Sequence, residues 1–404
     1  MTSSVKIDVP TASRAYQVHV GVGTIRRLRS LIKNAGGNGK CFVVSSPAIW
    51  KLHGGTIQSA LKNSEVILIP DGERSKTIRT VSGIYEPLIR SGADRSSTIV
   101  AVGGGVIGDV VGFAASTFLR GVQLVHVPTT LLAQVDSAIG GKVGVNHPLG
   151  KNLIGAFHQP IVVVADPKLL TTLPRREFRS GLYEVVKYGI IASRGLFDRI
   201  NTSLTEIFAH EPSVLIPIIG EACQIKATIV SKDERESGVR RTLNFGHTVG
   251  HAIEAVTHYR RFRHGEAVAY GMLAAAHIAV RRKMFSLPNE AALANLIGKL
   301  GPLPQVGDLS TLAIVAAVHR DKKVIKGRLH MVLPTAVGKT KIVGDVTDRE
   351  IIRSLKKIGI HQKPCLPLIA ITYAPADAES RVASQSPNLL TQSLTDDSGS
   401  ADSH

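Results

Sequence analysis

Short apolar runs separated by helical patterns occupy the first part of the chain. Residues 5–20 alternate apolar and polar side chains, which predicts a strand or hairpin. Apolar, β-branched runs then follow at 41–46, 66–70, 97–105, 122–128 and 161–166. Such runs suit strands that are buried on both faces, so the alternation predicts a parallel sheet with helices packed on it.

After about residue 166 the pattern changes to helical periodicity. Apolar side chains recur at helical spacing within 175–200, 213–234 and 247–256, and a late strand or extended piece is expected at 328–338. The last ~40 residues are rich in Ser, Ala, Asp and Pro and show no apolar face, which predicts disorder. We therefore expect an α/β domain at 1–170, an α-helical domain at 171–362 and a disordered tail at 363–404.

Composition narrows the class of protein. The chain has 404 residues, 44% of them hydrophobic, so it can bury a sizeable core in two or three domains. Its three cysteines lie far apart, which argues against a disulfide framework. We find no signal-peptide pattern and no uninterrupted apolar stretch of membrane-spanning length, so a cytoplasmic location without a membrane partner is expected.

The net charge of +18 suggests an anionic partner or a solvated basic surface. A nucleic-acid surface would usually add exposed aromatic side chains or a recognised reading motif, and aromatic residues make up only 4% of the chain. We therefore expect no nucleic-acid partner. Some of the basic clusters could instead face a phosphorylated small molecule.

A glycine-rich turn follows one predicted strand, within residues 100–113. Gly103, Gly105 and Gly108 fit the GxGxxG spacing, which lets a helix N-terminus approach a phosphate. A lone match is weak, because a tight turn also needs glycine for packing. Another turn at 70–76 carries Asp71, Glu73 and Lys76, which could bind ribose hydroxyls or lie in solvent.

A long polar stretch at 127–160 separates two predicted strands. It mixes glycines and apolar residues with polar ones that suit a phosphate or a polyhydroxylated substrate. These polar residues are Thr129, Thr130, Asp136, Lys142, Asn146, Lys151 and Asn152. An ordered loop of this length is usually functional, so we favour a binding role over a solvated surface loop.

Histidines in the helical half could hold a metal. His247 and His251 lie one helical turn apart, and His264 begins a further helical pattern. A catalytic zinc site needs three protein ligands and an open position. Spacing leaves open whether His251 or Glu184 completes the set, and paired helical histidines are often only polar surface.

Four motifs, in order, resemble the 3-dehydroquinate synthase family. They are GGGVIGDVVGF (103–113), the 127–157 stretch, TLPRREFRSGLYEVVKYG (172–189), and the pair LNFGHTVGHAIEA (243–255) and HGEAVAYGM (264–272). The resemblance covers roughly residues 5–360. It implies an N-terminal α/β domain with a parallel sheet that binds NAD, an all-α C-terminal domain that holds the metal, and a homodimer.

The resemblance also implies roles for individual residues. The ligands of zinc, or of cobalt in its place, would be Glu184, His247 and His264. NAD would contact Asp71, Glu73, Lys76, Gly104, Gly105, Asp109, Thr129, Thr130, Lys142, Lys151, Thr172 and Glu177. The substrate would contact Asp136, Lys142, Lys151, Asn152, Lys187, Lys226, Arg240, Asn244, His251 and one or both of Lys322 and Lys323. Arg120 would reach the neighbouring subunit's site.

The implied reaction converts 3-deoxy-D-arabino-heptulosonate 7-phosphate to 3-dehydroquinate and phosphate, through transient oxidation by NAD, phosphate elimination, re-reduction and aldol cyclisation. A related sugar phosphate cyclase is the near alternative, but the segment AQVDSAIGGKVGVN (133–146) has the dehydroquinate form. A metal-dependent dehydrogenase of the glycerol dehydrogenase type is the other alternative, and it would form NADH in net amounts. The turn at 43–50 departs from the family pattern near the adenosine end of NAD.

Overall fold

The apolar runs of the first half form the strands of one sheet, as predicted. In the computed structural model, which describes residues 4–320, 324, 325 and 328–361, seven strands of the described chain lie in the order β1-β2-β9-β6-β5-β3-β4. These are β1 (Val5–Pro10), β2 (Ala15–Val20), β3 (Cys41–Ser45), β4 (Glu65–Leu68), β5 (Thr98–Gly103), β6 (Gln123–Pro128) and β9 (Val162–Ala165). β1 and β2 pair antiparallel, and the other neighbours pair parallel, which confirms the expected sheet.

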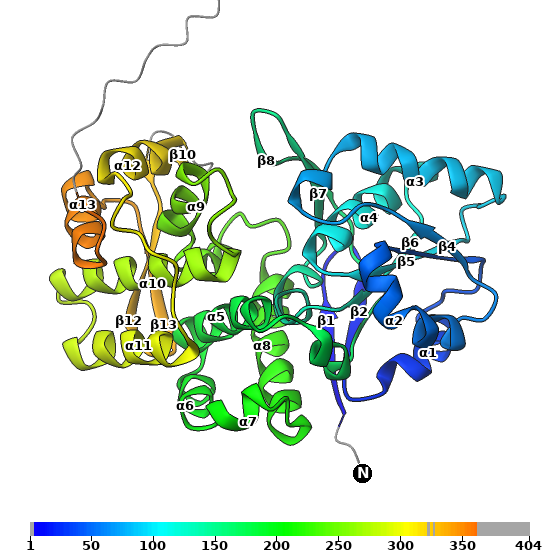
Figure 1. Ribbon diagram of the computed structural model, residues 1–404, viewed down its shortest axis with the longest axis horizontal. Helices are drawn as coiled ribbons and strands as arrows, with labels where there is room; N and C mark the ends of the chain where they lie inside the picture. The colour runs from blue at the N-terminus through cyan, green and yellow to red at the C-terminus, as the bar shows by residue number, and fades with distance from the viewer. Residues whose placement is uncertain (1–3, 321–323, 326–327, 362–404) are drawn as a thin grey trace, which may run out of the picture. The chain divides into compact units, whose positions relative to one another are not determined.

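Helices cover both faces of this sheet (Figure 1). Val43 and Val44 of β3 point to opposite faces, as successive strand residues do. Val43 shares a core with Ile57 of α2 (Pro47–Ala60), next to η1 (Thr24–Arg27) and α1 (Leu28–Asn34). Val44 shares a core with Ile107 of α4 (Gly105–Thr117), next to α3 (Ile78–Arg90). Burial on both faces explains why the strands are almost continuously apolar.

The polar stretch at 127–160 is more regular than the expected loop. It contains a π-helical turn, η4 (Ala133–Ser137), followed by an antiparallel hairpin of β7 (Lys142–His147) and β8 (Gly150–Phe157). Val143 and Val145 of β7 are buried, and β7 packs against α4. A Cβ at Gly112 of α4 would lie 2.3 Å from Val143, so the hairpin approaches the helix closely at a glycine.

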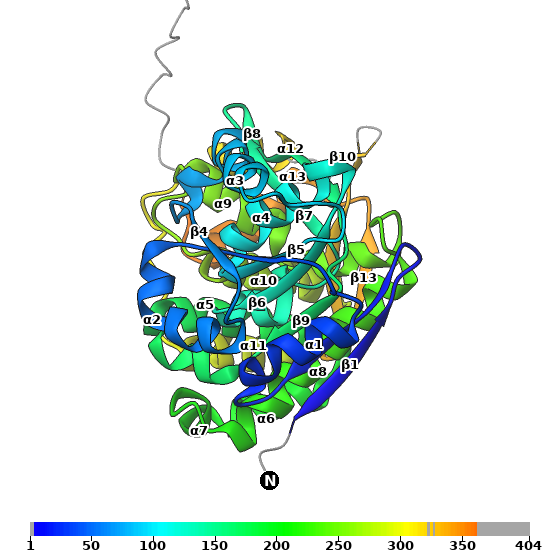
Figure 2. The same ribbon diagram turned by 90° about the vertical axis from the view of Figure 1, so that its right-hand side faces the viewer.

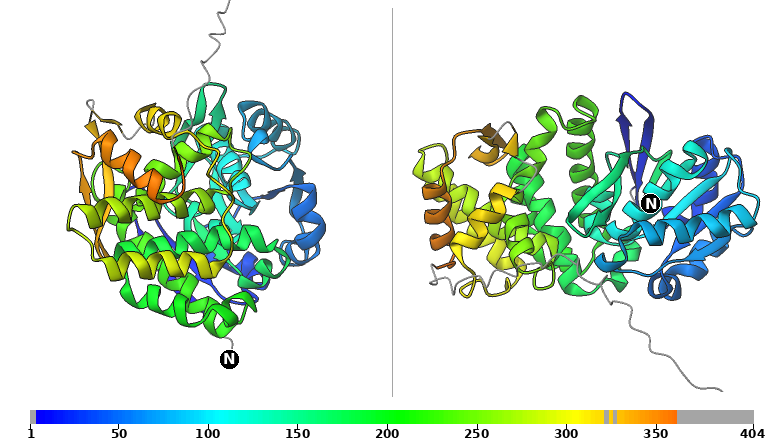
Figure 3. Two further views of the ribbon diagram at one scale, coloured as in Figure 1. Left: turned by 60° about the vertical axis from the view of Figure 1, so that its left-hand side comes forward. Right: turned by 90° about the horizontal axis from the view of Figure 1, so that it is seen from above.

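The second half is helical, as predicted (green to orange in Figure 3). Its helices are η5 (Pro167–Thr172), α5 (Arg175–Ala192), α6 (Arg194–Thr202), α7 (Leu204–Phe208), α8 (Pro212–Lys232), η6 (Val239–Asn244), α9 (His247–Val256), α10 (His264–Arg281), α11 (Leu287–Leu300), α12 (Thr311–Arg320) and α13 (Asp348–Lys357). The expected late strand is β12 (Met331–Ala336), which pairs with β13 (Lys339–Val343). A short pair, β10 (Val324–Ile325) and β11 (Arg328–Leu329), precedes it, so the helical half is not purely α.

Helix α8 joins the two halves through one hydrophobic core. It packs against β1 (Figure 2), and its residues Leu215 and Ile219 share a core cluster with Ile7 of β1. Among the described residues, α8 alone is long and apolar enough to resemble a membrane-spanning helix. Because α8 packs against β1, its apolar side chains are buried in the protein interior and not in a membrane.

Close packing of α9 and α10 brings two histidines together. A Cβ at Gly271 of α10 would lie 1.7 Å from the carbonyl oxygen of Gly246, the residue before α9. The two helices therefore meet where glycine leaves room for backbone-to-backbone contact. His247 and His264, the first residues of these helices, are thereby held near each other.

Candidate active site

A carboxylate and two histidines from three helices converge on one point. Glu184 of α5, His247 of α9 and His264 of α10 each place a ligand atom within 4.8 Å of the others. The Nε2 atoms of His247 and His264 lie 3.8 and 3.6 Å from Oε1 of Glu184. The resemblance to the family implied this group as the metal ligands, and the fold brings its members together.

The chemistry of the three side chains fits a divalent cation. Glu184 is fully buried, and its Oε1 has no hydrogen-bond partner in the described part of the chain. Leaving a buried carboxylate oxygen unpaired is costly, and a cation would satisfy it. His247 donates from Nδ1 to the carbonyl oxygen of Phe245 at 3.1 Å, which leaves Nε2 to face Glu184. Two nitrogens and one oxygen form a donor set that zinc accepts.

Glu254 supports the second histidine. Its Oε2 lies 3.4 Å from Nδ1 of His264, on the side of the ring away from Glu184. Burial alone would raise the pKa of Glu254, but the charges of His264 and Lys151 outweigh it and lower the pKa to about 2. A carboxylate behind a histidine commonly orients the ring toward a metal. We did not select Glu254 from the sequence, although it lies three residues after His251 on the same helical face.

His251 lies beside the three converging side chains. Its ring centroid is 5.2 Å from that of His247 and 5.9 Å from that of His264. It also forms an alternative cluster with Glu254 and His264. Both candidates that spacing left open, Glu184 and His251, are thus near the same point.

Asp136 is surrounded by three donors. Lys226 of α8 lies 2.7 Å from its Oδ1 and 2.6 Å from its backbone oxygen, and Lys187 of α5 lies 3.8 Å from the same Oδ1. Tyr188 of α5 donates its hydroxyl to Oδ1 at 2.5 Å. Burial would raise the pKa of Asp136, but the charges of Lys226 and Lys187 hold it well below its usual value. Lys187 also forms an ion pair with Oε2 of Glu184, so this group adjoins the metal candidate.

Lys142, Arg240 and Asn244 form a basic and polar group around one acid that we did not predict, Glu236. Glu236 forms an ion pair with Lys142 and accepts a hydrogen bond from Nδ2 of Asn244 at 2.8 Å. Arg240 is almost fully buried and donates to the carbonyl oxygens of Gly140, at 2.9 Å, and Glu234. Burial lowers the pKa of Arg240, although Glu236 and Asp136 oppose this. Nothing in the charged run around Glu236 distinguishes it in the sequence.

The predicted cofactor residues follow the carboxyl ends of the parallel strands. Asp71 follows β4, Gly104 and Gly105 follow β5, Thr129 follows β6 and Thr172 follows β9. Ligands bind at this edge of open α/β sheets. Thr172 lies 3.0 Å from Nε2 of His53, and Thr130 accepts a hydrogen bond from the backbone of Ala133.

A polar network ties the β7–β8 hairpin to the turn after β4. Lys76 pairs with Asp109 at 2.5 Å and donates to Asn152, while Glu73 accepts a hydrogen bond from Asn146 at 2.8 Å. Lys151 lies 3.3 Å from Glu73 and 3.8 Å from Glu254, close enough to connect this network to the metal candidate. The hairpin therefore lies between the strand ends and the helical half.

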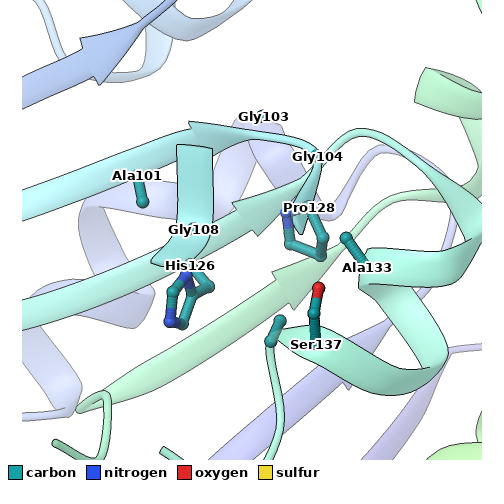
Figure 4. A pocket seen from close by; sticks show the side chains of 9 residues that line it. Ala101, Gly103, Gly104, Gly108, His126, Pro128, Ala133 and Ser137 are labelled. Atoms are coloured by element: carbon teal, nitrogen blue, oxygen red, sulfur yellow. The ribbon is translucent and has the colours of Figure 1, made fainter. Parts of the chain in front are cut away.

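The glycine turn has a packing role as well. A Cβ at Gly103 would lie 2.5 Å from Cβ of Ile107, so α4 needs glycine there. Behind the turn, His126 and Ser137 line a small cavity next to Gly103 and Gly104 (Figure 4). Burial lowers the pKa of His126 to about 4, so its ring is neutral near pH 7.

Two predicted residues, Arg120 and Glu177, are not part of these groups, and two others are outside the described residues. Arg120 ends η3 (Phe118–Arg120), beyond the C-terminal end of α4, whereas Gly104 and Gly105 begin that helix. Glu177 near the start of α5 pairs at 2.5 Å with Arg263, which precedes His264. Lys322 and Lys323 lie outside the described residues.

Comparison with known proteins gives consistent matches along the chain. The family model described as 3-dehydroquinate synthase N-terminal matches residues 66–180, and the one described as 3-dehydroquinate synthase C-terminal matches residues 181–324. A 3-dehydroquinate synthase of Rippkaea orientalis is 43% identical over 368 residues, covering 89% of this chain and 99% of the relative.

Two solved structures share the fold. The 2-epi-5-epi-valiolone synthase ValA of Streptomyces hygroscopicus subsp. jinggangensis, with NAD+ and Zn2+ bound, has a TM-score of 0.78 at 27% identity, and the match covers 85% of this chain and 96% of ValA. A 2-deoxy-scyllo-inosose synthase complexed with carbaglucose-6-phosphate, NAD+ and Co2+ has a TM-score of 0.76 at 29% identity, covering 87% and 99% of the two chains.

Proposed function

The chain belongs to the 3-dehydroquinate synthase family, and from this premise we propose how its residues carry out that activity. The reaction converts 3-deoxy-D-arabino-heptulosonate 7-phosphate to 3-dehydroquinate and phosphate, a step of the shikimate pathway to aromatic amino acids. The observation that carries the proposal is the convergence of Glu184, His247 and His264 next to the Asp136 group. A metal candidate therefore adjoins a set of charged donors suited to a sugar phosphate.

NAD and a divalent metal are the cofactors in this proposal. The structural relatives carry NAD+ with Zn2+ or Co2+, and the unpaired oxygen of Glu184 fits a cation. When bound, NAD supplies a hydride acceptor and the metal supplies a Lewis acid for an oxygen of the substrate. We assign the metal to Glu184, His247 and His264, and we place His251 on the substrate side.

The NAD site in this proposal follows the strand ends. The backbone at the start of α4 would receive the diphosphate, as helix N-termini bind phosphate. The residues assigned to NAD are Asp71, Glu73, Lys76, Gly104, Gly105, Asp109, Thr129, Thr130, Lys142, Lys151, Thr172 and Glu177. The contact of Thr172 with His53 supports an ordered hydroxyl at one of the positions assigned to NAD.

The substrate in this proposal lies between the Asp136 group and the group formed by Lys142, Arg240 and Asn244. Lys142, Arg240 and Asn244 would hold the phosphate or carboxylate, acting by charge and orientation. The other assigned residues are Asp136, Lys151, Asn152, Lys187, Lys226 and His251. Glu236 now pairs with two of the proposed anion holders, so the substrate anion would have to displace its carboxylate. Lys322 and Lys323 keep their expected role, although they lie outside the described residues.

We also propose roles for the domains, an oligomeric state and a cellular location. We assign residues 1–170 to cofactor binding, 171–362 to metal and substrate binding, and 363–404 to a tail outside the described residues. We propose a homodimer in which Arg120 serves the neighbouring site, a cytoplasmic location, and no nucleic-acid or membrane partner. The position of Arg120 beyond the far end of α4 supports its contribution to another subunit.

Comparison of sugar phosphates tests the proposed substrate. The purified, metal-loaded protein would be given NAD and either the heptulosonate phosphate, glucose 6-phosphate or a seven-carbon ketose phosphate that lacks the carboxylate. Phosphate release should be at least about 100-fold more efficient with the first, because the charged holders pair with its carboxylate and phosphate together. Equal or faster release from either of the other two would contradict the assignment.

A further inference from the structure

One oxygen of the Asp136 carboxylate carries all the hydrogen bonds and ion pairs that this carboxylate makes with the described residues. Lys226 at 2.7 Å, Lys187 at 3.8 Å and the Tyr188 hydroxyl at 2.5 Å all approach Oδ1. Within the described residues, no hydrogen bond or ion pair reaches Oδ2. The Asp136 side chain is 23% exposed, so part of it can be reached by a ligand. This asymmetry leaves one oxygen for a ligand.

The turn that carries Asp136 is clamped by two helices. From α8, Lys226 donates to the backbone oxygen of Asp136 at 2.6 Å, and Cys223 donates to that of Gln134 at 3.3 Å. Helix α5 approaches the residue before the turn at Gly181, where a Cβ would lie 2.6 Å from the backbone nitrogen of Leu132. These contacts hold the backbone of η4 in place. The orientation of the Asp136 carboxylate then depends on rotation about its side-chain bonds.

Tyr188 is suited to restrict the rotation of the Asp136 carboxylate. Ammonium groups have three rotatable donors and act largely as point charges, so the two lysines attract the carboxylate without directing it strongly. A tyrosine hydroxyl has one proton, lies in the plane of a rigid ring, and makes a directional bond. The Tyr188 side chain is fully buried, and burial raises the pKa of Tyr188 well above its usual value, so it stays a neutral donor.

We propose that Tyr188 is a positioning residue: its hydroxyl holds Oδ1 of Asp136, so that Oδ2 faces the substrate. This role rests on the proposed function, which places Asp136 against the sugar phosphate. Tyr188 lies one helical turn after Glu184, so the same helix would position both the metal and the carboxylate. Tyr188 itself would not touch the reacting atoms.

Tyr188→Phe removes the hydroxyl and keeps the buried ring. Tyr183→Phe is the matched control, because Tyr183 is a buried tyrosine on the same helix whose hydroxyl reaches the backbone of Gly301 at 3.4 Å. We expect Tyr188→Phe to lower kcat/KM for the heptulosonate phosphate about tenfold, mainly through a higher KM, because a bond to a charged group is lost. Tyr183→Phe should stay within twofold of the wild type.

Kinetic constants separate positioning from general damage. A misdirected carboxylate weakens binding of the substrate, so KM should rise in Tyr188→Phe alone while kcat changes little. The comparison of kcat with KM, and not the pH profile, therefore carries this test. The charged groups that face Asp136 are Lys187 and Lys226, with Arg240 further away, and both variants retain them. Equal kinetic losses in the two variants, or a fall in kcat with KM unchanged, would overturn the proposal.

Crystal structures of the two variants test the orientation without turnover. We expect the Asp136 carboxylate to rotate in Tyr188→Phe and to keep its wild-type orientation in Tyr183→Phe. An unchanged carboxylate in Tyr188→Phe would overturn the proposal even if kcat/KM fell. If the wild type itself released no phosphate, the proposed function would fail, while these structures would still decide whether Tyr188 orients Asp136.

Discussion

Single residues set the chemistry of this site through burial. A buried oxygen of Glu184 has no hydrogen-bond partner among the described residues, Glu254 contacts His264, and Lys226 is buried next to Asp136. A charge removed from water must be balanced by a partner, so each of these groups depends on a specific neighbour. The predictions for single residues concern the removal of such a neighbour or a change in the protonation state of one group.

Removing the carboxylate behind His264 should weaken metal binding. We expect Glu254→Gln to lower the affinity for zinc roughly 10- to 100-fold, because a supporting carboxylate orients the ring and increases its basicity. Competition with a chelating dye would measure the affinity. Glu290→Gln is the matched control, since Glu290 pairs with His277 at 3.1 Å in the same way, away from the metal candidate. A Glu254→Gln variant that binds zinc as tightly as Glu290→Gln would refute the supporting role.

The Lys226 ammonium should limit activity at high pH. Burial lowers the pKa of Lys226 to about 8 against the opposing effect of Asp136, from 10.5 for the free side chain. The charged form that holds Asp136 is therefore lost as pH rises through about 8, and kcat/KM should fall there. Between about pH 8 and 10.5 the unfolded chain binds more protons at this residue, so its contribution to the free energy of unfolding rises with pH.

Activity and stability should thus change in opposite directions over that window. A pH profile of kcat/KM, together with chemical denaturation at the same pH values, would measure both. Lys226→Arg should move the basic limb to higher pH, because arginine keeps its charge. A basic limb that Lys226→Arg leaves in place would show that another group titrates there.

At this scale, many residues of the candidate site can be predicted from the sequence. The residues that cannot be predicted are missed for one common reason. Glu184, His247 and His264 stand in long motifs that resemble the family, and that resemblance implied the group, whereas helical spacing alone left Glu184 and His251 as alternatives. Tyr188 and Glu236 escape prediction because one polar residue in an apolar helix, or one acid in a charged run, looks like any other. Their roles depend on which atoms the fold brings within hydrogen-bond distance.

Helices and strands are predictable where one pattern of apolar positions continues along the whole element. The strands β3, β5 and β9 are continuous apolar runs, and their bounds nearly match the expectation. The alternation of the β7–β8 hairpin is interrupted by glycines at 144, 150 and 155, so the pattern does not predict these two strands. At Gly144 a Cβ would lie 2.5 Å from the carbonyl oxygen of Ile154, so the feature that hides the hairpin from pattern analysis also permits its close pairing.

The segment between α9 and α10 contains backbone strain. His258 and Tyr259 have φ of 53° and 56°, in the left-handed region that disfavours residues with a Cβ. His258→Gly should therefore raise the free energy of unfolding by about 0.5–1 kcal/mol, since the side chain is exposed and contributes little packing. Arg260→Gly is the local control, because Arg260 is not among the residues with positive φ. Chemical denaturation that shows His258→Gly to be no more stable than Arg260→Gly would refute the strain.

At the scale of the whole molecule, the proposed homodimer makes a stoichiometric prediction. Arg120→Ala and Glu184→Ala should each be nearly inactive, but dimers with one subunit of each kind have one complete site if Arg120 serves its neighbour. Random assembly makes half the dimers mixed, so co-expression should recover about a quarter of wild-type activity. No recovery, in samples shown to contain mixed dimers, would place Arg120 in its own subunit's site or in none.

The balance of nicotinamide, phosphate and carbocycle tests the central claim most directly. The heptulosonate phosphate would be mixed with the zinc-loaded protein and a limiting amount of NAD, and phosphate, 3-dehydroquinate and NADH would be followed together. We predict equal amounts of phosphate and 3-dehydroquinate, each far above the NAD supplied, with no lasting NADH and with loss of turnover on chelation. Accumulation of NADH in step with substrate consumption, or no phosphate release from folded, metal-loaded protein, would contradict the account.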